Sequence, residues 1–169
     1  MDPQLTSFVV SEEETGHINE SLSQLLAETN ASYIMLIERS GQLISSQSNS
    51  SEEGKRVLGA LLAGSFASSR EIARVLNEND FTTLIQQGKY ESIFAESIIN
   101  TWILVVIYHK PTTLGMVQIY SKRTIKELAV VLERVKVESR STRVSIFSNL
   151  MRTSEVADTV DLLFKDLAS

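Results

Sequence analysis

The chain has 169 residues, 43% of them hydrophobic and 22% charged, with a formal net charge of −5 at pH 7. These values are ordinary for a soluble globular domain that is large enough to bury a stable core, and the acidic balance argues against a nucleic-acid surface. The lack of cysteine excludes disulfides, Cys-ligated zinc and thiol catalysis. Because neither a leader pattern nor an apolar run of about 18 residues is present, we expect a cytoplasmic protein without a membrane span.

The N-terminal part of the chain is predicted to contain a helix followed by two strands. Residues 1–10 are expected to form a flexible lead-in. Ser11 and Glu14 have the spacing of a capping box, which opens a helix that we expect to run to about Asn30. Two short runs separated by a Ser-Gly turn are then predicted to be strands: Tyr33–Ile37 and Gln42–Ser46.

A second capping-box pair, Ser50 and Glu53, precedes a predicted helix over Val57–Leu76 that has two unlike faces. At about 100° per residue the bulky side chains fall on one face, which we expect to seal the sheet: Leu58, Leu61, Leu62, Ile72 and Leu76. The opposite face begins with small residues and ends with charged ones: Gly59, Ala60, Ala63, Gly64 and Ala67, then Arg70, Glu71 and Arg74.

The small-residue face of this helix favours a docking surface. Helix-interior glycine costs about 1 kcal/mol relative to alanine, so the two glycines suggest that another element packs closely there. A helix that is buried on both sides within its own domain is the alternative interpretation.

Three more strands and a helix are predicted to complete the domain. The first two strands form a hairpin around a Gln-Gly-Lys turn, and the third is apolar without alternation, as in a strand covered on both faces: Phe81–Gln86, Tyr90–Ser97 and Trp102–Tyr108. A helix follows from about Leu114 to Glu138. The short connections favour antiparallel neighbours, so residues 11–138 are expected to form an α/β domain with one five-stranded antiparallel sheet and helices on both faces. An edge strand such as Phe81–Gln86 would remain open for pairing with a second copy.

The composition changes after Glu138. Residues 139–153 contain three arginines and no acid, and are expected to form a linker. Ser154 is then predicted to cap a last amphipathic helix over residues 154–169, which would be marginal without a surface to bind. Its apolar stripe could dock on its own domain or on a partner: Val156, Val160, Leu163, Phe164 and Leu167.

The sequence offers no pattern that is typical of a catalytic, metal or cofactor site. His17 and His109 have no neighbouring carboxylate cluster or ligand spacing. No Gly-x-Ser-x-Gly elbow is present. Gly59 and Gly64 have the spacing of the two glycines of a P-loop, but Ser65 stands where a P-loop has lysine, so no P-loop is present either. We therefore expect no catalytic residues and no cofactor.

The order of elements and several motifs resemble the Roadblock/dynein light-chain family. The motifs are GQLISS at Gly41–Ser46, LLAGSFAS in the middle helix, FTTLIQQGKYESIF from Phe81, WILVVIY, and TTLGMVQIY from Thr112. Within the family the chain is similar to the MglB-like group, bacterial polarity and motility regulators that partner the Ras-like small GTPase MglA. The resemblance covers residues 11–138 and extends to the acidic tail that contains LLFKDL.

This resemblance implies a homodimer whose paired middle helices form a platform for one small GTPase. On the matching positions it implies that these residues lie on the platform: Ala63, Gly64, Ala67, Ser68 and Glu71. It also implies that the tail helix grips the GTPase and promotes nucleotide exchange. GTPase activation would then occur without a catalytic group from this chain, although Arg70 or Arg74 could instead supply an arginine in trans.

Two functions from different classes therefore stay open. The chain is either a GTPase-activating regulator or a scaffold that localises a GTPase or a polarity protein without changing its turnover. A ligand-sensing domain of the PAS or GAF type is disfavoured, since the apolar strands carry no convergent polar groups.

Overall fold

The computed structural model describes residues 8, 10–49 and 55–167. It divides into two units, Ser11–Leu132 and a second unit made of Met1–Val10 with Glu133–Ser169. The helices and strands in chain order are α1 (Glu12–Thr29), β1 (Tyr33–Glu38), β2 (Leu43–Ser48), α2 (Lys55–Val75), β3 (Thr83–Gln87), β4 (Glu91–Ile98), β5 (Trp102–His109) and α3 (Leu114–Leu167).

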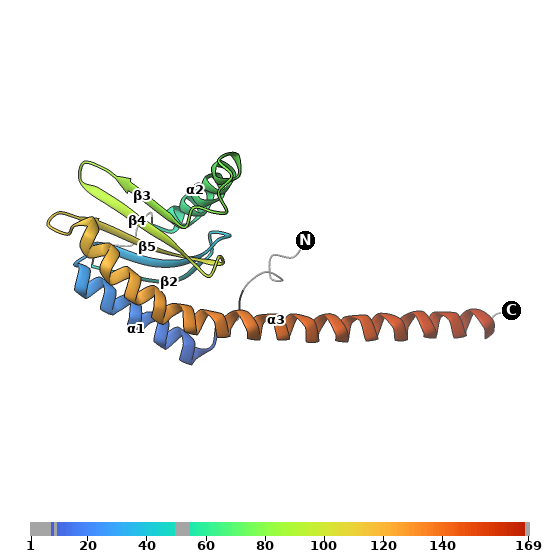
Figure 1. The fold of residues 1–169 in the computed structure, drawn as a ribbon. Helices are drawn as coiled ribbons and strands as arrows, with labels where there is room; N and C mark the ends of the chain where they lie inside the picture. The colour runs from blue at the N-terminus through green and yellow to red at the C-terminus, as the bar shows by residue number, and fades with distance from the viewer. Residues whose placement is uncertain (1–7, 9, 50–54, 168–169) are drawn as a thin grey trace. The chain divides into compact units, whose positions relative to one another are not determined.

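The five strands form one antiparallel sheet in the order β2-β1-β5-β4-β3 (Figure 1). Strand β5 lies at the centre, and seven of its eight residues are buried, which explains its unbroken apolar sequence. Strands β2 and β3 are the two edges and carry mostly partly exposed or exposed residues. The predicted sheet, and the prediction that the first strand of the second hairpin lies at an edge, are confirmed.

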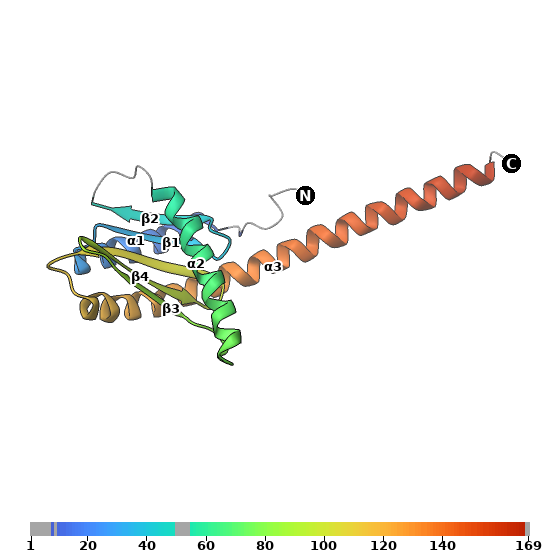
Figure 2. The ribbon, with the colours of Figure 1, turned by 90° about the horizontal axis from the view of Figure 1, so that it is seen from above.

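Helices cover both faces of this sheet, with α2 on one face and α1 together with the first turns of α3 on the other (Figure 2). On the α2 side, Leu62 and Phe66 pack against alternate residues of the two central strands: Tyr33, Met35, Ile37, Ile103, Val105 and Ile107. On the other side, Thr112 of the β5–α3 loop donates a hydrogen bond to the backbone oxygen of Thr29 at the end of α1.

Helix α1 begins with the predicted capping box. The hydroxyl of Ser11 accepts a hydrogen bond from the Glu14 amide at 3.2 Å, and the Glu14 carboxylate accepts one from the Ser11 amide at 2.9 Å. The helix ends at Thr29 and is capped by Asn30, which adopts a left-handed conformation with φ of 49°. The second predicted capping box, Ser50 with Glu53, lies outside the described residues.

The structure has neither the predicted linker over 139–153 nor a separate tail helix. Helix α3 continues without a break from Leu114 to Leu167, a length of 54 residues. The physical reason is that no glycine or proline follows Gly115, so no residue interrupts the i→i−4 hydrogen bonds, and Ser154 lies inside the helix instead of capping a new one. In the second unit, the guanidinium of Arg143 lies 5.5 Å from the ring centre of Phe8.

Among the described residues, no helix combines the length and the apolar character needed to cross a lipid bilayer.

Candidate protein-interaction surface

Helix α2 turns a narrow, well-packed face toward the sheet. Among residues 57–75, for which burial is described, five are buried and recur at helical spacing: Gly59, Leu62, Ala63, Phe66 and Ala73. The approach is closest at Gly59, where an added Cβ would lie 3.1 Å from the backbone oxygen of Gly41. Gly41 itself has a φ of 92°, which favours glycine at this turn. The β1–β2 turn therefore sets how near the helix can lie to the sheet.

The opposite face of α2, which we call the outer face, exposes large apolar side chains. Val75 is 81% exposed, Leu61 is 61% exposed and Ile72 is 54% exposed. Small residues lie between them and are also exposed, and no heavy atom lies within 4 Å of a Cβ built on Gly64. The outer face consists of Val57, Ala60, Leu61, Gly64, Ala67, Ser68, Glu71, Ile72 and Val75.

The expected orientation of α2 is partly wrong. Leu61, Ile72 and Leu76 were expected to seal the sheet but are exposed, whereas Gly59 and Ala63 were expected to face outward but are buried. The cause is Phe66, which is 4% exposed and packs in the centre of the buried face. A helical wheel centred on this one aromatic residue of the helix would have identified the buried face.

Gly59 and Ala63, two of the predicted docking positions, thus belong to the core. Ala60, Gly64, Ala67, Ser68 and Glu71 are on the outer face. The Ser68 hydroxyl donates to the Gly64 carbonyl at 3.1 Å, so the hydroxyl is satisfied within the helix. This part of the surface is smooth and presents few polar groups to a partner.

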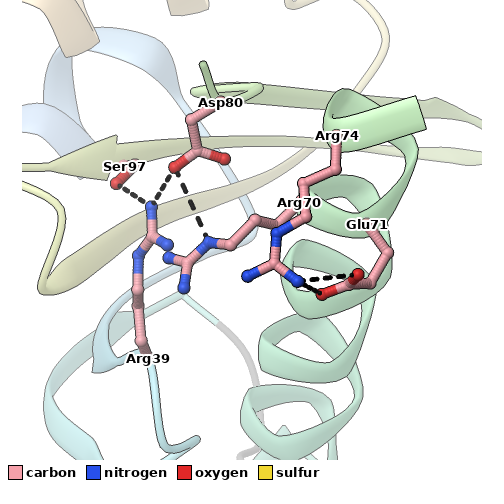
Figure 3. A network of polar contacts seen from close by, with 6 residues as sticks. All are labelled: Arg39, Arg70, Glu71, Arg74, Asp80 and Ser97. Carbon is pink, nitrogen blue, oxygen red and sulfur yellow. Dashed lines mark hydrogen bonds and ion pairs between the residues drawn. The ribbon is translucent and has the colours of Figure 1, made fainter. Parts of the chain in front are cut away.

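Arg70 points toward its own domain and belongs to a polar cluster at the end of the sheet (Figure 3). The Asp80 carboxylate lies 3.0 Å from Nη2 of Arg39 and 4.0 Å from Nε of Arg70. Arg39 also donates to the Ser97 hydroxyl at 3.0 Å. The cluster ties α2 to the β1–β2 turn and to the segment that leads into β3.

Arg74 is engaged differently, in an exposed ion pair on α2 itself (Figure 3). Its Nη1 lies 2.9 Å and 3.0 Å from the two carboxylate oxygens of Glu71, one helical turn earlier. Pairs of this kind stabilise a helix by only a few tenths of a kcal/mol, so a partner can displace the contact at little cost.

Among the described residues, no cluster of three or more histidine, aspartate and glutamate side chains is placed to hold a metal ion. His17 is exposed and lies 4.0 Å from Glu13 in the same helix. His109 is exposed at the end of β5. Burial raises the pKa of Glu96, and the nearby Lys122 ammonium opposes that shift. Desolvation explains this shift without a catalytic role.

The predicted tail stripe is helical in backbone, since it lies within α3. The side chains of Val156, Val160, Leu163, Phe164 and Leu167 lie outside the described part of the chain.

Comparison with known proteins identifies the family to which this fold belongs. The model of the Roadblock/LC7 domain matches residues 17–108, and the chain belongs to this family. Among solved structures it is similar to Myxococcus xanthus MglB, with 31% identity, a TM-score of 0.70 and coverage of 75% of this chain and 96% of that one. It is also similar to the gliding protein MglB of Thermus thermophilus, with 26% identity, a TM-score of 0.72 and coverage of 79% and 99%.

A further similar structure is described as MglB with a tetrameric arrangement. It is 25% identical, has a TM-score of 0.73, and the match covers 80% of this chain and 99% of that one. The chain is thus an MglB-like Roadblock protein, as the sequence motifs suggested.

Proposed function

We propose that this protein is a homodimeric regulator that binds a Ras-like small GTPase of the MglA type and stimulates its hydrolysis of GTP. The observation that carries the proposal is the exposed apolar outer face of α2. Contiguous apolar surface of this kind marks an interaction site in a folded protein. The family and the similar MglB structures support a Ras-like small GTPase as the partner and a role in bacterial cell polarity or motility.

On this proposal, both a second copy of the chain and the GTPase bind at the outer face of α2. The small residues Ala60, Gly64, Ala67 and Ser68 allow another backbone to come close, and the apolar side chains beside them supply area to bury. The open edge of β3 lies on the same unit and offers unpaired backbone groups to a second copy. The tetrameric arrangement described for one MglB is consistent with self-association in this group.

The ion pairs of Arg70 and Arg74 favour activation of the GTPase without an arginine supplied by this chain. Arg70 is directed at Asp80, and Arg74 is paired with Glu71. GTP hydrolysis requires a positioned water and stabilisation of the transferred charge. We infer that the chain acts by reshaping the GTPase, so that the GTPase's own side chains supply both.

The end of α3 is proposed as a second contact with the GTPase. Its apolar stripe, from Val156 to Leu167, has helical spacing, and the acidic side chains around it complement a basic surface. A contact made through this segment would promote nucleotide exchange.

Single-turnover GTP hydrolysis by the cognate MglA-like GTPase tests the proposal. We expect the full-length chain to raise the rate at least about tenfold, and by less than the roughly 10³- to 10⁵-fold that an arginine finger supplies. A pull-down with GTP-loaded and GDP-loaded GTPase should show preference for the GTP form. An unchanged rate with equal binding of both forms would identify a scaffold instead of an activator.

A further inference from the structure

A hollow of about 520 Å³ lies between the β3–β4 hairpin and the start of α3. The hairpin lines it through residues 87–90 and Ser92, and the end of β5 with the following loop lines it through residues 108–114. None of the lining residues belongs to α2, so this hollow is separate from the outer face. Its volume is in the range that holds small organic ligands.

The charge of the hollow is positive. Lys89 and Lys110 line it, and no aspartate or glutamate among the described residues does. Helix α3 begins at Leu114, and the amides of a helix's first turn have no partner within the helix. The Thr113 hydroxyl accepts from the Met116 amide at 3.3 Å, which leaves the amides of Leu114 and Gly115 available to a ligand. These amides and the helix dipole favour a negative charge.

A buried hydroxyl gives a second, independent indication of a ligand. Tyr108 lines the hollow, is only 4% exposed, and its hydroxyl has no hydrogen-bond partner in the described part of the chain. Its register partner Ser92 lines the same hollow, and paired residues of neighbouring strands share a face. A buried phenol without a partner is costly, and an anionic acceptor would remove that cost.

Apolar groups complete the lining. Tyr90 is 77% exposed, and its ring lies 5.1 Å from the Lys89 ammonium. Pro111 and Leu114 also line the hollow. The hollow is much larger than one phosphate group, so it has room for an organic body attached to the anion.

We propose that this hollow binds a phosphate monoester, either of a small soluble compound or of a phospholipid headgroup. Lys89 and Lys110 neutralise its charge, the first-turn amides of α3 and the Tyr108 hydroxyl donate to its oxygens, and Tyr90 and Pro111 contact its organic part. Lysine side chains and helix N-termini are established binding groups for phosphate. The proposal is independent of the GTPase-regulating function.

The test is a titration of the ¹⁵N-labelled full-length chain followed by amide chemical shifts. The probes are inorganic phosphate, glycerol 3-phosphate, and phosphatidylcholine vesicles with and without phosphatidic acid. We expect saturable binding, with shifts at the amides of Leu114 and Gly115. Binding of glycerol 3-phosphate without a membrane indicates a soluble ligand, and binding only to vesicles with phosphatidic acid indicates a headgroup; either result supports the site.

Three variants make the test specific. Tyr108→Phe and Lys110→Gln should each weaken binding about tenfold, because each removes a hydrogen bond or charge contact to an anion. Lys126→Gln removes the same charge from an exposed position of α3 that does not line the hollow, and should leave binding unchanged. The proposal is overturned if no probe binds saturably, or if the control weakens binding as much as the other two.

Discussion

At the scale of single residues, the polar cluster around Asp80 shows how a charged side chain can serve the fold. Arg70 resembles a docking residue in the sequence, because it continues the side of α2 that begins with small residues. In the structure only Gly59 and Ala63 of that side are buried, and the Arg70 side chain lies against Asp80 of its own domain. No local pattern links Arg39, Arg70 and Asp80, so this contact was not predictable from spacing.

The polar cluster predicts that Asp80→Asn lowers the unfolding free energy more than Glu71→Gln does, although each removes one negative charge. Asp80→Asn leaves Arg39, whose side chain is only 17% exposed, without its ion-pair partner. We expect a loss of about 1 to 3 kcal/mol in unfolding free energy, between the values typical of exposed and buried pairs. Glu71→Gln is the control because it breaks an exposed pair, and it should cost less than about 0.5 kcal/mol. Urea unfolding at one fixed protein concentration measures both, and equal losses would contradict the assignment.

At the scale of elements, the existence and order of the helices and strands were predicted correctly, whereas the orientation of α2 was predicted wrongly. The apolar runs of β1 and β5 and the capping box of α1 are local signals, and the structure has these elements within one or two residues of the predicted bounds. The orientation of α2 was missed because the leucines, and not Phe66, were expected to mark the buried face. The close approach of Gly59 to the distant Gly41 is a tertiary contact that no local pattern indicates. The linker was wrongly predicted because a change in composition does not by itself break a helix.

Two leucines that are adjacent in α2 test its orientation. Leu62 is 3% exposed, so Leu62→Ala should lower the unfolding free energy by about 2 to 5 kcal/mol at every protein concentration. Leu61 is 61% exposed, so any effect of Leu61→Ala should arise from an interface and should change with protein concentration. Urea unfolding followed by circular dichroism over a range of concentrations separates the two. A large, concentration-independent loss for Leu61→Ala would restore the orientation expected from sequence.

At the scale of the whole molecule, the two sides of α2 have different tasks. The inner side closes the core through Leu62 and Phe66. The outer side leaves Leu61, Ile72 and Val75 exposed, although a chain folded only for itself would gain by placing polar residues there. We propose that a small GTPase binds this exposed side, and the similarity to MglB structures supports that proposal.

The most direct test measures how a charge on the outer face changes binding to the GTP-loaded GTPase. Ala67 is exposed on that face, and Ala67→Arg should weaken the dissociation constant about 30-fold or more, as expected for a central interface position. Ala27→Arg makes the same change at an exposed position of α1, on the other side of the sheet, and should leave the dissociation constant unchanged. Circular dichroism should show both variants folded. Binding by Ala67→Arg with the affinity of the unmodified chain would contradict the assignment of the outer face as the docking surface.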